Sequence, residues 1–337
     1  MSFKVRIEPS GHEFRVEDDE SILEAALRQG FAFPYGCRNG ACGSCKGKVL
    51  EGGVDYGGEL PPALSAAEAE AGQALFCQAH ALGDVTIEVR EIGAAKDIPI
   101  KTMPCRVAKL ERLADDVMAV YLKLPMNERL QYLAGQYLDI LLRDGRRRSF
   151  SIANAPHDDE FIELHIKHIE GGRFTHEVFS SMKEKQILRI EGPLGNFYLR
   201  EDSNRPIILM AGGTGFGPIK AIVEHAIAEG LTRPMHLYWG ARTRQGLYMD
   251  ALVRRWTEEH PHIEYVPVLS APLADDHWDG RTGYVQDKVM EDFEDLSAYE
   301  LYASGPPRMV YEGRDLLMTK GADPEHYYSD AFEFAKD

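Results

Sequence analysis

The sequence places three cysteines in a short glycine-rich stretch and a fourth further along. Cys37, Cys42 and Cys45 are separated by four and then two residues, and Cys77 follows after thirty-one more. This spacing is typical of a [2Fe–2S] cluster, which needs thiolates converging from one tight loop and a distant fourth ligand. Glycines within the loop allow the backbone to fold around the cluster. A structural zinc site is the alternative, but zinc motifs usually contain paired short knuckles, and only one short pair is present here.

A second candidate group follows a strand predicted over residues 137–142. It comprises the stretch 148–151, read as Arg-Ser-Phe-Ser, and two later glycine-containing turns at 171–175 and 192–195. An arginine suits paired contacts with phosphate oxygens. Taken alone, the basic run 146–148 favours a solvated turn, so its interpretation as a phosphate site depends on the turns that follow.

A third candidate group lies where a strand gives way to a helix. The apolar run 207–211 precedes Gly212, Gly213, Thr214 and Gly215, and Pro218 stands near the start of an amphipathic helix. Such a turn lets a pyrophosphate approach the amino end of a helix. Alone, a glycine loop is weak evidence; here the flanking strand and helix strengthen it.

The elements that must position these residues form three blocks. Residues 4–7 and 13–16 predict a hairpin, Ser21 begins a helix ending at Gly30, and 85–89 predict a closing strand. Short strands at 106–110, 117–124, 137–142, 161–169 and 187–191 indicate an antiparallel barrel. Strands at 207–211, 235–239 and 265–269 alternate with helices, which predicts a parallel sheet.

We therefore expect a multidomain α+β and α/β protein. The predicted divisions are a ferredoxin-like domain at 1–90, a linker at 91–104, a barrel at 105–203 and a nucleotide-binding domain at 204–337. The linker is expected from its two prolines and its lack of periodicity.

Composition narrows the function classes. The chain of 337 residues has a formal net charge of −16, which argues against nucleic acid or an anionic membrane as a partner. The amino end lacks an apolar signal core, and no apolar run is long enough to span a bilayer. These features predict a soluble cytoplasmic protein. The fifth cysteine, Cys105, has no partner pattern and is expected to be structural.

The first block resembles the plant-type ferredoxin domain over most of residues 1–90, because Arg38, Asn39, Ala41 and Ser44 also fit that family's cluster loop. The resemblance implies a β-grasp fold and assigns the cluster ligands. These are Cys37, Cys42, Cys45 and Cys77.

The second block resembles the flavin domain of the ferredoxin–NADP reductase family, whose first motif reads Arg-x-Tyr-Ser. The resemblance implies that Arg148 pairs with flavin phosphates, that Phe150 replaces the usual tyrosine against the ring, and that the Ser151 hydroxyl approaches flavin N5. It favours FAD over FMN. It also implies contacts from Ser149, His165, Ile166, Lys167, Gly172, Arg173, Phe174 and Thr175.

The third block resembles the nicotinamide domain of the same family. The resemblance implies that Gly213, Thr214, Gly215 and Pro218 hold the pyrophosphate and that Ser304, in place of a frequent cysteine, lies beside the nicotinamide with Gly305 and Pro306. Phe332 is the candidate for an aromatic ring covering the flavin, although a plain core aromatic fits equally.

The choice of nicotinamide depends on the stretch 240–244. Arg242 or Arg244 would suit the 2′-phosphate of NADPH, whereas relatives with a similar Gly-Ala-Arg-Thr stretch and a fused ferredoxin mostly use NADH. We favour NADH, with NADPH as the alternative.

The order of the three blocks resembles the reductase components of bacterial oxygenases and reductases serving deoxysugar dehydrases. It implies an NADH-dependent electron-transfer reductase that passes hydride from NAD(P)H to FAD, and single electrons through the cluster to a partner protein. Ser151, Ser304 and Phe332 are the expected catalytic residues. The alternatives are a redox-sensing iron–sulfur regulatory module, which has no need of a hydride donor, and a free-standing flavin or ferric reductase.

Overall fold

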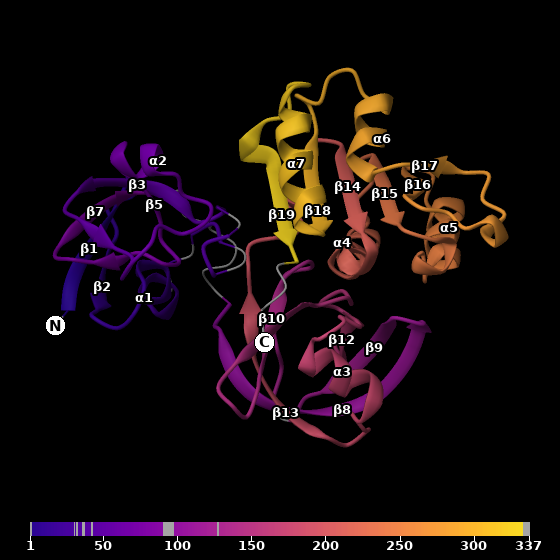
Figure 1. The fold of residues 1–337 in the computed structure, drawn as a ribbon, viewed down its shortest axis with the longest axis horizontal. Coiled ribbons are helices and arrows are strands. Elements are labelled where there is room, and N and C mark those ends of the chain that lie inside the picture. The colour runs from indigo at the N-terminus through magenta and orange to yellow at the C-terminus, as the bar shows by residue number, and fades with distance from the viewer. Residues whose placement is uncertain are drawn as a thin grey trace. The chain divides into compact units, whose positions relative to one another are not determined.

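The fold is seen in a computed structural model that describes residues 2–29, 31, 33–35, 38–41, 43–89, 98–126 and 128–332. It divides into two compact units, Met1–Pro99 and Ile100–Asp337, which are described separately below (Figure 1).

The first unit is built on a mixed five-stranded sheet in the order β2-β1-β7-β3-β5. The predicted hairpin is present as an antiparallel pair, and β7 runs parallel to β1. A separate two-stranded sheet pairs β4 with β6. The strands are β1 (Ser2–Glu8), β2 (Glu13–Glu17), β3 (Lys46–Glu51), β4 (Val54–Asp55), β5 (Gln73–Leu75), β6 (His80–Ala81) and β7 (Val85–Glu88).

Two short helices complete the first unit, α1 (Ile22–Arg28) and α2 (Ala66–Glu70). The predicted capping box at Ser21 is confirmed: the Glu24 N–H donates to Ser21 Oγ at 3.2 Å, and the Ser21 N–H donates to Glu24 Oε2 at 3.0 Å. Helix α1 buries Ile22 and Leu23 against a core that includes Phe33 and Phe76. This core lies beside the two described cysteines, Cys45 and Cys77, which belong to the same cluster of buried residues.

The second unit begins with six antiparallel strands in the order β11-β10-β13-β8-β9-β12. An isolated antiparallel bridge between Ile152 and Leu164 connects the two strands at the ends of this order. The sheet therefore curves back on itself around a core that contains Val107, Leu138 and Ile190. The elements are β8 (Lys101–Ala114), β9 (Val117–Lys123), β10 (Tyr137–Leu141), β11 (Arg147–Ser151), β12 (Ile162–Lys167), α3 (Arg173–Ser180) and β13 (Ile187–Leu194).

Strand β8 starts earlier than the sequence predicted. Residues 101–104, expected to be linker, already pair with β13, and Met103 and Cys105 alternate inward with Val107. Pro104 is compatible with this strand because pairing with β9 begins only at Arg106, where an N–H is first needed on that side.

Strand β11 is a second element that the sequence did not predict as a strand. Its residues pair with β10 from Leu141↔Arg147 to Tyr137↔Ser151. The arginines at its start hid the alternating pattern. The cost of placing them in a sheet is small because the Arg147 guanidinium forms ion pairs with Asp139 and Glu191 from the two neighbouring strands.

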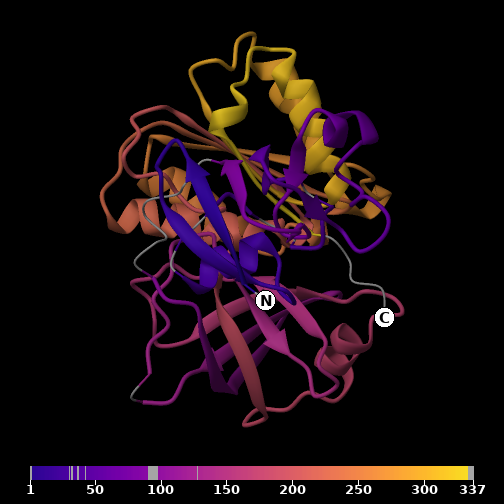
Figure 2. The same ribbon diagram turned by 90° about the vertical axis from the view of Figure 1, so that its left-hand side faces the viewer.

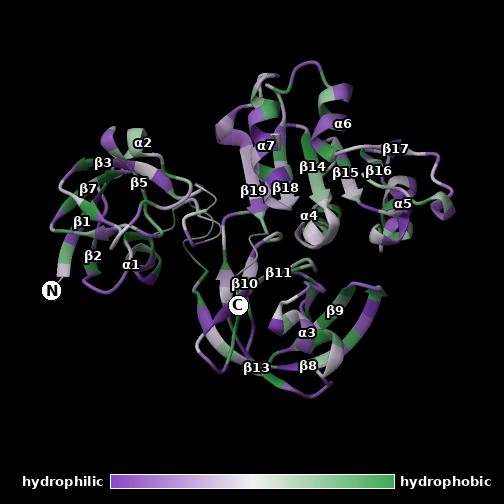
Figure 3. Cartoon of the chain, in the orientation of Figure 1, coloured by the Kyte–Doolittle hydropathy of each residue, from purple (hydrophilic) through white to green (hydrophobic). Residues whose placement is uncertain are grey.

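The rest of the second unit is a parallel sheet in the order β17-β16-β15-β14-β18-β19. The central strand β14 is fully apolar and buried, and it stands out as hydrophobic in Figure 3. The chain order changes direction between β14 and β18, which creates a switch point at the carboxyl ends of these strands. The strands are β14 (Ile207–Gly212), β15 (Met235–Ala241), β16 (Ile263–Leu269), β17 (Arg281–Thr282), β18 (Glu300–Gly305) and β19 (Tyr327–Ala331).

Helices cover both faces of this sheet (Figure 2). One face packs against α4 (Phe216–Ala228) and α5 (Asp250–Glu259), and the opposite face against α6 (Val285–Asp292) and α7 (Pro307–Met318). Short 3₁₀ turns lie at Gly213–Gly215, Arg244–Gly246, Ala274–Asp276 and Pro324–His326. No helix in the described part of the chain is long and apolar enough to cross a bilayer.

The barrel and the parallel sheet meet through buried charged groups. Lys220 on α4 places Nζ 3.1 Å from Glu163 Oε2 on β12, and both side chains are less than a tenth exposed. Burial alone raises the pKa of Glu163, but the hydrogen bond from His165 and the charge of Lys220 outweigh it and lower this pKa to about 2.

This lowered pKa predicts acid sensitivity of the second unit. Because the folded-state pKa lies below the ordinary value of 4.5, the stabilisation is complete above about pH 4.5 and is lost as pH falls towards 2. We expect a loss of up to about 3 kcal/mol across this window. Tryptophan fluorescence during thermal unfolding reports this unit alone, since all three tryptophans, Trp239, Trp256 and Trp278, lie in it.

The matched control is the double variant Glu163→Gln/Lys220→Met, which removes both charges together. Its unfolding midpoint should fall less steeply between these pH values than that of the wild type. An equal slope in both proteins would refute this role for Glu163.

Candidate functional site

The loops after β14 and β18 pack backbone against backbone at the switch point. A Cβ on Gly215 would lie 2.0 Å from the Ser304 carbonyl oxygen, and one on Gly305 would lie 2.8 Å from the Gly212 carbonyl oxygen. Gly305 also has φ +140°, a conformation that disfavours any side chain. Glycine is therefore required at both positions, and the two predicted nicotinamide motifs form one surface.

Ser304 is fully buried in this surface, and its Oγ has no hydrogen-bond partner in the described part of the chain. A buried hydroxyl without a partner is costly unless a bound group satisfies it. Thr214, which is also buried, and Gly213, with φ +55°, lie in the adjacent 3₁₀ turn. Pro218 is the third residue of α4 and is buried.

The barrel contributes Ser151, which lies beside the end of the parallel sheet. Its Oγ donates to Asp330 Oδ2 at 2.6 Å, across 179 residues of sequence. Asp330 is on β19, and two residues later the Phe332 N–H donates to the Gly305 carbonyl oxygen at 2.9 Å. The chain around Phe332 is thereby tied to the same surface that contains Ser304.

The two predicted flavin motifs of the barrel lie next to each other. The Phe150 and Phe174 rings are 5.6 Å apart, which connects β11 to the start of α3. Ser149 Oγ donates to Asp139 Oδ1 at 2.6 Å, and the Arg148 guanidinium donates to the neighbouring Arg147 carbonyl oxygen.

The turn before α3 is shaped by Thr175. Its Oγ1 accepts from the Ile169 N–H at 3.2 Å and lies within 3.3 Å of the Ile169 and Gly172 carbonyl oxygens. A Cβ on Gly172 would lie 2.8 Å from the same hydroxyl. The Thr175 side chain therefore holds the turn together at the amino end of α3, where the N-cap residue, Gly172, has no side chain to cap the helix.

The predicted residues of β12 direct their side chains into protein contacts. His165 and Ile166 are buried, and Lys167 pairs with Asp116 at 3.2 Å. Burial lowers the pKa of His165, so its ring is neutral at ordinary pH. Any contact from this strand to a cofactor thus comes from its backbone.

Arg242 and Arg244 follow the carboxyl end of β15 and are exposed. The Arg244 guanidinium donates to the Asp276 carbonyl oxygen at 3.2 Å, and its N–H donates to Asp276 Oδ2. Arg244 is therefore held against the turn at 274–276.

Of the four predicted cluster ligands, Cys45 and Cys77 are described and buried, and Cys37 and Cys42 lie outside the described residues. The Cys77 N–H donates to Cys45 Sγ at 3.4 Å. An amide that donates to sulfur stabilises a thiolate, which is the form that binds a metal cluster.

The described part of the cluster loop adopts the turns that its glycines predict. Gly40 and Gly43 have positive φ angles, and a Cβ on Gly40 would lie 2.7 Å from Pro61. The residues present thus fit a cluster. Cys105, outside this loop, is buried on β8, and burial raises the pKa of its thiol to about 12.

Asp330 and Asp139 were not predicted as site residues, although Asp330 lies two residues before Phe332 and Asp139 lies on the strand predicted at 137–142. A single acidic residue is not distinctive in sequence, and their serine partners lie 179 and 10 residues away. Lys220, Glu163 and Tyr248 were not predicted either, since they carry no motif.

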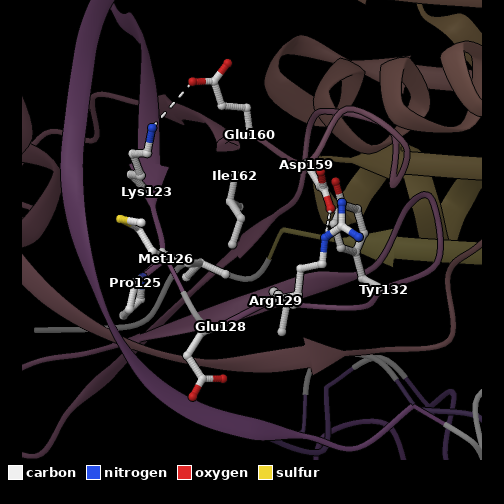
Figure 4. Close-up of a pocket in the computed structure, with 11 residues that line it drawn as sticks. Lys123, Pro125, Met126, Glu128, Arg129, Tyr132, Asp159, Glu160 and Ile162 are labelled. Carbon is white, nitrogen blue, oxygen red and sulfur yellow. Dashed lines mark hydrogen bonds and ion pairs between the residues drawn. The ribbon is translucent and has the colours of Figure 1, made fainter.

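A pocket of about 400 Å³ opens elsewhere on the barrel and contains none of the predicted residues (Figure 4). Its charged side chains pair with each other, Lys123 with Glu160 at 3.4 Å and Arg129 with Asp159. It is therefore distinct from the surface described above.

Comparison with known families agrees with this arrangement. The 2Fe-2S iron-sulfur cluster binding domain matches residues 5–82, the oxidoreductase FAD-binding domain matches 104–198, and the oxidoreductase NAD-binding domain matches 209–314.

Whole-length relatives are also found. The chain is 39% identical to CDP-6-deoxy-L-threo-D-glycero-4-hexulose-3-dehydrase reductase from Yersinia pestis, over 98% of this chain and 99% of the relative. It is 32% identical to terephthalate 1,2-dioxygenase reductase component 1 from Comamonas sp., over 98% of each. The crystal structure of the Amycolatopsis cytochrome P450 reductase GcoB superposes with a TM-score of 0.82 at 33% identity, over 98% of both chains.

These matches confirm the predicted resemblance and the three cofactors, a [2Fe–2S] cluster, FAD and NAD. The chain therefore belongs to the family of reductases in which a [2Fe–2S] ferredoxin domain precedes FAD- and NAD-binding domains, and it is an NAD(P)H-dependent oxidoreductase.

Proposed function

We propose that this chain takes hydride from NADH and delivers single electrons to a separate protein. The observation that carries the proposal is the hydrogen bond from Ser151 to Asp330, which joins the flavin motif of the barrel to the end of the nicotinamide surface. When bound, FAD and the cluster supply the conversion of a two-electron donor into one-electron transfers. The residues of the chain bind, orient and shield these groups.

On the flavin side, we assign phosphate binding to Arg148 and to the backbone N–H groups at the start of α3, from Arg173 to Thr175. The half-buried Arg148 guanidinium, which suits paired contacts with phosphate oxygens, and the glycine N-cap of α3 support this assignment. Phe150 and Phe174 supply an aromatic wall. Because Ser151 donates its proton to Asp330, its oxygen lone pairs are left to accept a hydrogen bond from the N5–H that the flavin ring carries once it is reduced.

On the nicotinamide side, we assign the pyrophosphate to Gly213, Thr214 and Gly215 and the nicotinamide to Ser304, Gly305 and Pro306. The buried Ser304 hydroxyl, which lacks a hydrogen-bond partner among the described residues, supports this, since a carboxamide group offers both donor and acceptor. Phe332 is proposed to cover the flavin ring, because its backbone is tied to Gly305.

We propose NADH as the preferred donor. Arg244 is engaged with Asp276, which reduces its availability for a 2′-phosphate. Arg242 is left as the residue through which NADPH would bind.

The finer domain divisions are proposed as a β-grasp ferredoxin domain at 1–90, a flavin β-barrel at 101–203, which starts earlier than the predicted 105, and a Rossmann-like nicotinamide domain at 204–337. The mixed sheet of the first unit and the closing bridge of the barrel support these assignments. The linker is shorter than 91–104, because β8 starts at Lys101.

For the acceptor, we propose an oxygenase or a deoxysugar dehydrase component in the cytoplasm. The names of the relatives from Yersinia pestis and Comamonas sp. support these two classes. In either case the four cysteines form the outlet. The direct test is anaerobic reduction of a one-electron protein acceptor by NADH and the purified holoenzyme; an enzyme that reduces no such acceptor would contradict the proposal.

Replacing one cluster ligand should separate the two halves of the electron path. In Cys77→Ser, we expect loss of the cluster spectrum and of protein-acceptor reduction, because one thiolate ligand is missing. Reduction of bound FAD by NADH should continue at the wild-type rate. Visible absorbance and cytochrome reduction measure the two activities.

The matched control is Cys105→Ala, which removes the buried thiol on β8 and should keep the cluster. If Cys77→Ser still reduces the protein acceptor at the wild-type rate, the chain is a free-standing flavin reductase and the cluster is not the outlet.

Removing the Ser151 hydroxyl should slow hydride transfer. In Ser151→Ala we expect the rate of FAD reduction at saturating NADH to fall about tenfold or more, because the oriented oxygen is lost. Stopped-flow absorbance measures this rate, and the FAD content should be unchanged. Ser180→Ala, which removes an exposed hydroxyl on α3, is the control and should behave as the wild type. An unchanged rate in Ser151→Ala would refute the assigned role.

A further inference from the structure

A group of buried charges lies where α4 crosses the barrel, outside the residues assigned to either cofactor's phosphates or rings. Lys220 Nζ is surrounded by three oxygens, the Ala153 carbonyl at 3.1 Å, Glu163 Oε2 at 3.1 Å and Glu224 Oε2 at 3.0 Å. The ammonium therefore uses all three of its protons within the protein.

The second oxygen of Glu163 extends the contact further. His165 Nε2 donates to Glu163 Oε1 at 2.8 Å, and His165 Nδ1 lies 2.9 Å from the Tyr248 hydroxyl. Because the His165 ring is neutral, Nε2 carries its proton and Nδ1 accepts from Tyr248. Tyr248 packs edge-on against Trp239, whose ring stacks on Phe216 at the start of α4.

Close packing accompanies these polar contacts. A Cβ on Gly217 would lie 3.4 Å from the Ala153 Cβ and 3.6 Å from His165 Nδ1. The first turn of α4 thus rests directly on β12 and on the segment that follows β11. Both distances are ordinary van der Waals contacts, so helix and barrel are packed here without a gap.

The free energy of folding does not by itself explain why an ion pair such as Lys220–Glu163 is buried here. The cost of removing two charges from water cancels much of their attraction, and well-packed apolar side chains often serve as well. The Lys220 ammonium differs from an apolar contact because its three hydrogen bonds are kept only while all three oxygens stay within hydrogen-bond distance of one nitrogen. It can therefore set the relative position of the elements that carry it.

We propose that Lys220 and Glu163 are positioning residues that fix the nicotinamide loop against the flavin barrel at the distance that hydride transfer requires. Lys220 lies five residues after Gly215, Ala153 lies two residues after Ser151, and Glu163 lies two residues before His165. The Lys220 ammonium therefore connects α4, β12 and the segment after β11. Each of these segments lies only a few residues from a residue that was assigned to a cofactor. This inference rests on the proposed function, because it assumes those contacts.

The positions of these residues explain why a small displacement would matter. Reacting atoms must come to about 3–3.5 Å, and a misplacement of about 1 Å can slow a reaction about a hundredfold. NADH is bound through many contacts along its own length. Its affinity therefore depends less than the rate of hydride transfer on the exact position of one loop. Loss of the pair should therefore change the rate of hydride transfer more than the affinity for NADH.

The test compares the holoenzyme with Lys220→Met, with Lys220→Arg and with the double variant Glu163→Gln/Lys220→Met. Stopped-flow reduction of bound FAD over a range of NADH concentrations gives the saturating rate and the dissociation constant separately. Hydrogen–deuterium exchange of the peptides covering α4 and β12 gives a readout that does not depend on turnover. Arg254→Met, which removes an exposed ion pair with Asp250 on α5, is the matched control.

We expect the saturating rate to fall roughly 10- to 100-fold in Lys220→Met, with a dissociation constant within about twofold of the wild type. Lys220→Arg should recover part of the rate, since it keeps the charge. Exchange should become faster in α4 and β12, and Arg254→Met should match the wild type in every measurement.

The double variant guards against misfolding caused by one unpaired buried charge. If Lys220→Met loses FAD, the double variant decides the outcome. A folded double variant that reduces FAD slowly supports the proposal. A double variant that reduces FAD at the wild-type rate overturns it. Wild-type rate and affinity in Lys220→Met also overturn it, whatever its unfolding temperature. If NADH does not reduce the FAD of the wild type, the proposed function is wrong. In that case hydrogen–deuterium exchange alone tests the positioning role, and unchanged exchange in α4 and β12 of the variants would refute it.

Discussion

Hydride passes only between atoms that are almost in contact, so the barrel and the parallel sheet of this chain must hold a fixed separation. Two contacts between the barrel and the parallel sheet enforce this separation. Ser151 meets Asp330 beside the carboxyl ends of the strands, and Lys220 meets Glu163 where α4 crosses β12. The residues between them, including Gly217, allow the helix to lie close to the barrel.

The parallel sheet contributes the other half of this geometry. Its strand order reverses between β14 and β18, and their two loops can touch only because Gly215 and Gly305 lack side chains. That close approach encloses the Ser304 hydroxyl, which has no hydrogen-bond partner among the residues that the structure describes. The glycines are local features of the sequence, but only the topology of the sheet brings their two loops together.

The sequence predicted the three blocks well because their signals are local. Cys37, Cys42 and Cys45 lie within nine residues, the capping box from Ser21 spans four, and the strand–turn–helix signal occupies residues 207–218. Strand β11 was missed because its arginines mask the alternation, and the start of β8 was missed because Pro104 resembles a linker residue. In the folded protein, pairing with neighbouring strands accommodates both the arginines of β11 and Pro104 of β8.

The contacts between barrel and sheet could not be predicted in the same way. Ser151 and Asp330 are 179 residues apart, and Glu163 and Lys220 are 57 apart. Lys220 also lies on a helix whose other described residues are largely apolar, where a lysine would ordinarily be placed facing solvent. Only the folded arrangement shows that it is buried and paired.

The central claim is that electrons reach the cluster only by way of the flavin. The most direct measurement adds NADH anaerobically to protein that retains its cluster but has been stripped of FAD, and follows the cluster by electron paramagnetic resonance. The account predicts no cluster signal until FAD is restored, and a signal soon after it is added. A cluster reduced by NADH in the absence of FAD would contradict it.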